Sequence, residues 1–401
     1  MRVGGAGYSD ATLHERPPRL RILHTSDWHL GRTLHGVDLT EHHAAFLEHL
    51  VEVVRERAVD VVVVAGDVYD RAVPAVPSVR LLSDAFARLS DLATVIVTPG
   101  NHDSATRLGF AAGLMRPSLR ILASVDDVAE PVVVTDSDGP VAFYGVPYLN
   151  PDDVRYAFGA EPLPRSHEAV MAAALAGVRD NLAGRDGARS VVVAHAFVVG
   201  GAASESERDI RVGGVDSVPT GLFDGFSYVA LGHLHGQQTL RSDRAVIRYS
   251  GSPLAFSFGE RTQVKSTTLI ELAADGSVAL EQIPAPVPRR LSEITGDLAD
   301  LLDGRHDDVV DDWLRIFVTD AVHPAGLHAL LRERFPHVLA IQHVPTGGLA
   351  PSERRAIAVD ADPVEVATGF VEYAAGAAPT GVEIAVLRSA YERARSAEAS
   401  D

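Results

Sequence analysis

The chain has 401 residues, of which 46% are hydrophobic, and its 36 basic and 54 acidic side chains give a formal net charge of −18. The apolar fraction excludes disorder over the whole chain, and the length predicts two or three domains of roughly 100–200 residues each. The acidic balance gives no electrostatic argument for a nucleic-acid or anionic-membrane partner, because such partners usually bind basic surfaces.

Cysteine is absent, which excludes disulfides, cysteine-ligated zinc and a cysteine nucleophile. Any metal ion must therefore be held by His, Asp, Glu or Asn. The longest apolar runs, such as residues 61–65, are far shorter than the roughly 18 residues that a membrane span requires. Residues 1–19 lack the apolar stretch of a secretory signal and are predicted to form a loose N-terminal extension. We expect a soluble cytoplasmic protein without membrane contact.

From residue 20 onward, short apolar runs end abruptly in residues that can bind a metal ion. Each run is predicted to be a buried strand. The runs and the polar residues that follow them are 20–23 with Asp27 and His29, 59–65 with Asp67, 94–97 with Asn101 and His102, 191–193 with His195, and 228–231 with His233 and His235.

Helices are predicted between these strands, at residues 40–57, 77–92 and 166–182. Asp38 and Glu41 have the spacing of a capping box at the start of the first helix. Strands that alternate with helices predict right-handed β-α-β units, and uniformly apolar strands predict a sheet covered on both faces. Ligands of such sheets lie beyond the carboxyl ends of the strands, so the polar residues should converge there.

The later part of the chain is predicted to close the sheet and then continue into smaller units. Additional strands are predicted at 141–145, 245–250, 267–272 and 278–283, the last two as a hairpin around Asp275 and Gly276. Alternating prolines in residues 283–290 predict a stiff linker and a domain boundary. The segments beyond it are a strand at 314–319, a helix from Pro324, a strand at 338–344, and a second joint at 347–352.

Two helices with capping-box spacing are predicted at the end of the chain, beginning at Asp362 and Thr380. The second places Ile384, Leu387 and Tyr391 on one stripe. This stripe fits two alternatives, docking on its own domain or a helical arm that binds a partner.

Four short motifs supply mixed nitrogen and oxygen ligands: DWH at 27–29, GDVYD at 66–70, GNHD at 100–103 and GHLH at 232–235. Together with His195, they offer the carboxylate, amide and imidazole groups that a pair of divalent cations prefers. Glycines before the ligands in three motifs let the chain turn sharply and approach the ions closely. One such motif is common by chance, but the ordered set on strand ends strongly favours a metal centre.

In this order, the motifs resemble those of the calcineurin-like metallophosphoesterases. More narrowly, five stretches resemble the SbcD family, the nuclease subunits of bacterial SbcCD complexes: ILHTSDWHLGR (22–32), GDVYD (66–70), GNHDS (100–104), YVALGHLH (228–235) and YSGSPLAFSFGE (249–260). The resemblance covers about residues 20–290. It implies an α/β core at 20–285 with two packed β-sheets flanked by helices, a small α/β capping domain at 286–346, and a helical partner-binding arm at 347–401.

The resemblance also implies roles for individual residues. One metal ion would be held by Asp27, His29 and His235, the other by Asn101, His195 and His233, and both by Asp67 as a bridge. His102 would protonate the leaving alkoxide or stabilise the charge on the phosphate, and Asp70 would pair with it. A water or hydroxide acidified by the two divalent ions would attack phosphorus in line, with Mn²⁺ as the family's usual activator.

This family assignment further implies a DNA substrate, a homodimer and an SbcC-like coiled-coil ATPase as partner. ATP chemistry should reside in that partner, because the chain has no G-x-x-x-x-G-K-[ST] loop. Two competing functions are a small-molecule phosphodiesterase or phosphatase on the same site, and a non-catalytic scaffold. The YSGSPLAFSFGE stretch argues against the first, and the complete ligand set argues against the second.

Several residues near the motifs fit either a structural role or a functional one. Packing is expected for Trp28, with base stacking as the alternative. A helix-surface or strand-packing position is expected for the histidines outside the set, which include His24, His35, His42, His43 and His49. Asp103 fits either a turn or support of the ligands. Two roles fit Arg32, Arg71 and Arg107, a contact with phosphate or a surface ion pair. Residues 204–208 are expected to form an exposed loop, with a flank of the substrate groove as the alternative.

Overall fold

The computed structural model of the chain describes residues 19–204, 206–207, 217–242, 244–345, 362–375 and 378–398. The chain divides into two compact units, Met1–Pro288 and Arg289–Asp401. Residues 1–18 of the predicted extension and the predicted joint at 347–352 lie outside the described residues. None of the described helices combines the length and hydropathy needed to cross a membrane.

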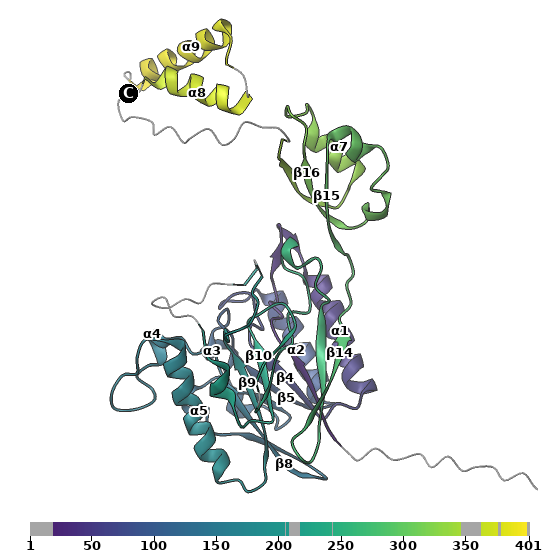
Figure 1. Ribbon diagram of the computed structural model, residues 1–401, viewed down its shortest axis with the longest axis vertical. Coiled ribbons are helices and arrows are strands. Elements are labelled where there is room, and N and C mark those ends of the chain that lie inside the picture. Colours follow the sequence, from purple (N-terminus) through teal and green to yellow (C-terminus); the bar gives the residue numbers. More distant parts are fainter. Residues whose placement is uncertain are drawn as a thin grey trace, which may run out of the picture. The chain divides into compact units, whose positions relative to one another are not determined.

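The first unit contains two six-stranded sheets (Figure 1). In spatial order, the first sheet consists of β14 (Val278–Pro284), β13 (Ser266–Leu272), β1 (Leu20–Thr25), β4 (Val61–Ala65), β5 (Thr94–Thr98) and β6 (Leu119–Ile121). The second consists of β11 (Gln238–Leu240), β12 (Val246–Tyr249), β10 (Tyr228–Gly232), β9 (Arg189–His195), β8 (Gly139–Val146) and β7 (Val132–Asp136). The central strands β1, β4 and β5 are parallel, as are β8, β9, β10 and β12.

Alternation along the strands explains why they are apolar throughout. In β4, Val61 and Val63 belong to the core between the two sheets, whereas Val62 and Val64 pack in the core beneath the helices. Successive side chains of a strand point to opposite faces, so a strand covered on both faces needs apolar residues at every position. The predicted fold of two packed sheets flanked by helices is confirmed.

Helices cover the outer faces of the two sheets. Phe46 and Leu50 of one helix and Phe86 of another pack on the first sheet, and Val170 and Leu175 of a third pack on the second. The helices of this unit are α1 (Thr40–Glu56), α2 (Val76–Ser90), the short α3 (Ala105–Leu108) and α4 (Pro151–Val154), and α5 (His167–Ala183). A two-stranded ribbon is formed by β2 (Thr33–Leu34) and β3 (Val37–Asp38).

The predicted hairpin is confirmed, since β13 and β14 pair antiparallel. The prediction of a capping box at the start of α1 is wrong. Asp38 accepts the Thr40 N–H at 2.8 Å, but the residue at the cap is Leu39, which makes no side-chain hydrogen bond. Ser166 caps α5 instead by accepting the Ala169 N–H.

The second unit begins with a three-stranded parallel sheet of β15 (Leu291–Gly296), β16 (Trp313–Val318) and β17 (Val338–His343). The sequence analysis missed β15 and the short α6 (Leu298–Leu302). Between β16 and β17, α7 (Leu327–Arg334) begins three residues later than predicted, after Gly326 in a left-handed conformation with φ of 70°. Leu314, Ile316 and Leu331 are fully buried in the core of this sheet.

The last described elements are α8 (Pro363–Ala375) and α9 (Gly381–Glu398), which contact each other. The predicted capping box of α9 forms: Glu383 accepts the Thr380 N–H at 2.7 Å, and Thr380 Oγ1 accepts the Glu383 N–H at 3.4 Å. The stripe of Ile384, Leu387 and Tyr391 is half-buried. Val382 and Val386 remain 75% and 60% exposed, so apolar surface is left uncovered on α9.

Candidate metal centre

The predicted metal-binding residues lie together at one edge of the first unit. They are Asp27 and His29 after β1, Asp67 after β4, Asn101 after β5, His195 at the end of β9, and His233 and His235 after β10. The parallel strands of both packed sheets end at this edge, which brings residues far apart in sequence within bonding distance.

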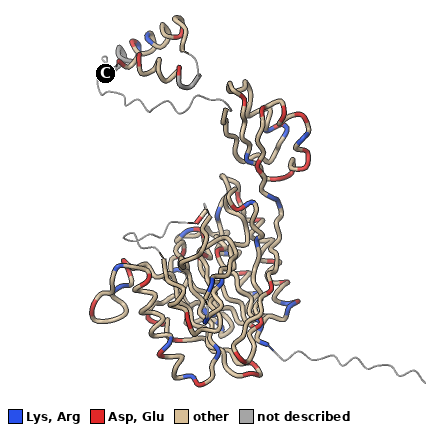
Figure 2. Tube along the Cα trace, viewed as in Figure 1, with Lys and Arg blue, Asp and Glu red and all other residues tan. Residues whose placement is uncertain are grey.

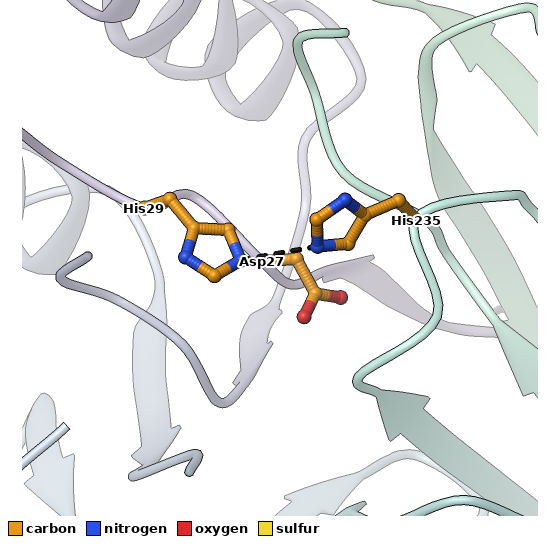
Figure 3. A group of neighbouring side chains, drawn as sticks. All are labelled: Asp27, His29 and His235. Atoms are coloured by element: carbon orange, nitrogen blue, oxygen red, sulfur yellow. Dashed lines mark hydrogen bonds between the residues drawn. The ribbon is translucent and has the colours of Figure 1, made fainter. Parts of the chain in front are cut away.

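His29 and His235 point toward each other in the first half of this cluster, with Asp27 beside them (Figure 3). The Nε2 atoms of the two imidazoles are 3.1 Å apart. The ligand atoms of all three residues lie within 4.8 Å of one another, and all three side chains are buried. This spacing lets the three groups bind a single cation from different directions.

Asn101, His195 and His233 form the second half. The Asn101 Oδ1 atom is 2.9 Å from His195 Nε2 and 3.2 Å from His233 Nδ1. Asp67 lies between the halves, with its Oδ2 atom 3.6 Å from His29 Nε2 and 3.5 Å from His195 Nε2. One carboxylate is therefore within reach of both halves, which is the position that a bridging ligand requires.

The backbone at the cluster is strained. Asp27, His29, Asp67 and His233 have positive φ angles of 54°, 46°, 48° and 108°, which residues other than glycine rarely adopt. Such conformations cost roughly 1–3 kcal/mol each and concentrate at functional sites. The strain turns these side chains off the strand ends and toward one another.

Glycines preceding the ligands allow a close approach of the backbone. A Cβ atom on Gly66, which has a φ of 83°, would lie 2.2 Å from His195 Nδ1. A Cβ atom on Gly232 would lie 1.8 Å from the Ala65 carbonyl oxygen. The predicted need for glycine at these turns is confirmed, because any side chain would separate the two sheets at this edge.

The electrostatics of the cluster favour a bound cation. Burial and the neighbouring Asp67 carboxylate raise the pKa of Asp27 well above its ordinary value. Burial lowers the pKa of His29, His195 and His233, which keeps these imidazoles neutral. In the described part of the chain, neither Asp27 nor Asp67 pairs with Lys or Arg. Buried carboxylates among neutral imidazoles form a donor set that divalent cations complete.

The orientation of His195 shows that the residues fit metal ions. Its Nδ1 lies 3.0 Å from the Ala65 carbonyl oxygen, so the ring proton is on Nδ1 and the Nε2 lone pair is free. That lone pair faces the oxygen of Asn101, while the Asn101 Nδ2 atom is buried without a partner. Two acceptors that face each other without a proton between them are stabilised by a cation.

His102 lies beside the cluster. Its Nδ1 is 2.8 Å from the main-chain oxygen of Asp70 and 3.9 Å from Asp70 Oδ1. The predicted partner therefore orients His102 through its carbonyl group, with its carboxylate farther away. His102 Nε2 lies 4.0 Å from Asp67 Oδ2, and the ligand atoms of His102, His29 and Asp67 fall within 4.8 Å of one another. The imidazole is thus directed at the cluster of candidate ligands.

Asp103 supports the loops that carry the ligands. Its Oδ2 accepts the N–H groups of Val68 and Gly100 at 3.0 and 2.9 Å, and its Oδ1 accepts the N–H of Tyr69 at 2.9 Å. Burial and the Asp67 charge raise the pKa of Asp103 to about 7. Of the two alternatives, the structure favours support of the ligands, since one carboxylate joins the turns after β4 and β5.

The structure also shows the surroundings of Trp28 and Arg32, two further residues near the motifs. Trp28 packs in the core, fully buried, with its Nε1 2.8 Å from Thr25 Oγ1. Arg32 lies over the Phe256 ring at 4.8 Å, and its NH1 is 3.8 Å from Asp70 Oδ1. A phosphate contact by Arg32 stays a prediction.

Four further side chains lie around His235, and the sequence analysis assigned none of them a contact with a ligand: Ser206, Glu207, Glu260 and Lys265. Glu207 Oε1 accepts the His235 N–H at 2.8 Å, and Ser206 Oγ is 2.6 Å from His235 Nδ1. The expectation of an exposed loop is therefore wrong for Ser206 and Glu207. For Glu260, the only signal was its place in the YSGSPLAFSFGE stretch.

A model of the calcineurin-like phosphoesterase family matches residues 20–237. The chain belongs to this family. The matched segment contains all seven candidate ligands, together with Asp70 and His102. Metallophosphoesterases bind two divalent metal ions, and the two halves of the cluster around Asp67 provide a place for each.

Three solved structures are similar to the metallophosphoesterase chain at low identity. The protein TT1561 of Thermus thermophilus is 16% identical with a TM-score of 0.40, and the match covers 66% of this chain and 99% of that one. A dimetal phosphatase from Danio rerio is 13% identical with a TM-score of 0.39 and coverages of 67% and 96%. GAP50, the anchor in the inner membrane complex of Plasmodium, is 10% identical with a TM-score of 0.38 and coverages of 83% and 99%.

Proposed function

We propose that this metallophosphoesterase is a manganese-dependent DNA nuclease subunit of the SbcD type. It would act in the cytoplasm as a double-strand exonuclease and single-strand endonuclease in DNA repair and recombination. The observation that carries phosphodiester hydrolysis is the convergence of six nitrogen and oxygen ligands around a seventh, Asp67, with His102 beside them. The ligand set mixes carboxylate, amide and imidazole, which suits Mn²⁺ better than a tetrahedral structural zinc.

The narrower assignment to the SbcD type is supported by residues 249–260. The family model ends at residue 237, but this later stretch contacts the metal centre. The Phe256 ring lies edge-on to His29 at 5.2 Å and to His235 at 5.4 Å. Glu260 Oε1 is 3.3 Å from His235 Nδ1. The stretch on which the resemblance depends therefore forms part of the site.

The residues of this chain orient the ligands and keep the imidazole ligands neutral. Two divalent ions, when bound, supply Lewis-acid chemistry that acidifies water and offsets the charge of the phosphodiester. The Ala65 carbonyl fixes the tautomer of His195, so that its Nε2 is unprotonated. Burial keeps His29, His195 and His233 neutral, which is the protonation state of an imidazole ligand.

His102 is the group proposed to act on the leaving alkoxide. Its Nδ1 donates to the Asp70 carbonyl, which leaves Nε2 directed toward Asp67 and the substrate side of the cluster. A proton held on Nε2 can be transferred to a leaving oxygen, or can hydrogen-bond to the phosphate and stabilise its charge. The nearer carboxylate oxygen of Asp70 lies 3.9 Å from the same Nδ1 atom.

We propose that α8 and α9 bind an SbcC-like coiled-coil ATPase. Val382 and Val386 of α9, and Phe370 of α8 with 68% exposure, supply apolar surface for such a contact. Helices that expose apolar residues at three- and four-residue spacings commonly dock against partner helices. Deletion of residues 362–398 should abolish co-purification with the ATPase and leave hydrolysis of a small phosphodiester unchanged.

A homodimer is also proposed, through α2 and the segment after α3. Val79 and Phe110 are 43% and 79% exposed and line a groove of about 390 Å³ together with residues such as Leu82 and Met115. Exposed apolar side chains gathered at one groove favour a protein interface. Light scattering should show a dimer for the wild type and a monomer for Phe110→Asp.

The charge distribution limits how the chain can bind DNA. Residues 1–285 carry 25 basic and 35 acidic side chains, and residues 286–401 carry 11 and 19. Basic and acidic residues are interspersed along the described trace (Figure 2). Binding would depend on the ions, local arginines and the partner, so DNA affinity of the isolated chain should be weak and salt-sensitive. Tight binding that persists at high salt would contradict this expectation.

The test of the proposed function compares two substrates in Mn²⁺. The purified chain, alone and with its partner ATPase, is assayed on labelled linear duplex DNA and on a chromogenic phosphodiester. We expect cleavage of both. Cleavage of the ester without DNA degradation in either preparation would favour a small-molecule phosphodiesterase, and no cleavage of either substrate would favour a scaffold.

A further inference from the structure

A chain of polar side chains runs from the His235 imidazole to the ammonium group of Lys265. Ser206 Oγ lies 2.6 Å from His235 Nδ1 and donates to Glu260 Oε1, which is itself 3.3 Å from His235 Nδ1. The other oxygen of Glu260 accepts a hydrogen bond from Lys265 Nζ. Glu260 and Lys265 are only 1% and 5% exposed, so their ion pair lies in the protein interior.

The proton positions in this chain follow from Glu260. An ionised carboxylate can only accept, so the Ser206 hydroxyl donates to Glu260 and accepts from the Nδ1–H of His235. The Lys265 ammonium group donates to one oxygen of Glu260, and the other oxygen lies 3.3 Å from His235 Nδ1, so both neighbours offer hydrogen-bond donors to the carboxylate. With its proton on Nδ1, His235 presents the Nε2 lone pair to the first half of the cluster.

Lys265 is the only lysine among the 36 basic residues of the chain. Besides Glu260, its Nζ donates to the His235 carbonyl oxygen at 3.1 Å and to Ser252 Oγ and Gln263 Oε1, both at 2.9 Å. A compact ammonium group can serve acceptors on several sides, whereas the planar guanidinium fork of arginine needs more room and a different geometry. The single lysine thus occupies a position where arginine fits poorly.

We propose that Glu260 and Lys265 are positioning residues that hold the His235 imidazole toward the metal site formed with Asp27 and His29. They set the divalent-cation affinity of that half of the cluster without contacting the cation or the substrate. Stabilisation of the fold is by itself a weak explanation for the buried Glu260–Lys265 ion pair, because the desolvation of two buried charges offsets much of their attraction. The inference rests on the metal centre of the family and is independent of which phosphoester is cleaved.

The test is calorimetric titration of Mn²⁺ into the metal-free full-length chain, as wild type and as the Glu260→Gln/Lys265→Met double variant. Removing both charges leaves no buried ion unpaired, so we expect the variant to fold. The affinity of one Mn²⁺ site should fall roughly 10–100-fold while the other keeps its affinity. Wild-type affinity at both sites, or an equal loss at both, would overturn the proposal.

A second variant decides the question if the double variant does not fold. Ser206→Ala deletes only a half-buried hydroxyl from the chain to His235, and it should cause the same one-site loss at a smaller size. Wild-type affinity in this variant would overturn the proposal.

The matched control is Arg189→Met/Asp136→Asn, which removes the ion pair between the buried Arg189 and the half-buried Asp136, at the far end of β9 from His195. Its Mn²⁺ affinity should equal that of the wild type. A loss as large as in the test variant would show a general effect of removing buried charge and would also overturn the proposal.

Discussion

Two buried histidines of the first unit differ in what their ring nitrogens face. Inside the sheet sandwich, His24 has Nδ1 3.0 Å from the Tyr228 hydroxyl and Nε2 3.2 Å from the Leu231 carbonyl oxygen. At the sheet edge, His195 has Nδ1 on a carbonyl oxygen, but its Nε2 faces the oxygen of Asn101. Burial lowers the pKa of both rings. Burial therefore does not distinguish a core histidine from a candidate ligand. The distinguishing feature is an unprotonated ring nitrogen that faces no hydrogen-bond donor.

A second difference lies within the cluster itself. His195 is oriented by a main-chain carbonyl, which no side-chain substitution removes. His235 is oriented by Ser206 and Glu260, and through them by Lys265. The half of the cluster that contains His235 should therefore respond to substitutions well outside the ligand set, and the half that contains His195 should not.

The largest effect should come from Asp67→Asn, because both halves share this carboxylate. Loss of a group that only orients a ligand costs roughly 10–100-fold, so loss of the shared ligand should lower kcat/KM by more than about 100-fold. The measurement is hydrolysis of a chromogenic phosphodiester in Mn²⁺. Activity above a tenth of the wild type would remove Asp67 from the shared position.

His102→Ala should lower turnover by about 10²–10⁴-fold, the usual contribution of a positioned acid or base. Because His102 lies beside the cluster, the variant should keep both Mn²⁺ sites in calorimetry. Near-full nuclease activity would remove the proposed role. Loss of Mn²⁺ binding would instead place His102 among the ligands.

Metal binding should stabilise the fold, since the buried carboxylates of Asp27 and Asp67 form no ion pair with Lys or Arg in the described part of the chain. At 100-fold excess over the dissociation constant, each site adds about 2.7 kcal/mol to the free energy of unfolding. Thermal melting with and without Mn²⁺ measures this. The Asp67→Asn variant should show a much smaller shift, and an equal shift would mean that Mn²⁺ binds elsewhere.

The smallest effect concerns the interior histidine and appears only at low pH. Burial lowers the pKa of His24 from 6.5 to about 3, so below pH 6.5 the unfolded chain binds a proton that the folded chain does not. Stability contributed by this residue is thus lost as the pH falls from 6.5 toward 3, by about 2 kcal/mol at pH 5. Urea unfolding at pH 7 and 5 should show a smaller loss for His24→Gln, with Mn²⁺ affinity at pH 7 unchanged. An identical loss in both proteins would contradict the assignment.

The sequence predicted the features that depend on local pattern. Apolar runs ending in ligands indicated the strands and the edge where they converge, because parallel strands align their carboxyl ends. The spacing of Thr380 and Glu383 predicted a capping box that does form. The same spacing at Asp38 and Glu41 predicted one that does not form, because Asp38 accepts from Thr40, the first residue of the helix.

Other features depend on tertiary contacts and left no local signal. The edge strand β15 pairs with β16 in register, but its sequence from Leu291 to Gly296 has no continuous apolar run. In sequence, Glu260 and Lys265 have the pattern of two surface charges, and only the fold brings their ion pair behind His235.

The assignment of two divalent ions to the sheet edge is tested most directly by anomalous diffraction from crystals grown with Mn²⁺. We expect two peaks, one bound by Asp27, His29 and His235 and the other by Asn101, His195 and His233, with Asp67 contacting both. A single peak, or peaks away from these residues, would contradict a two-metal centre in this chain.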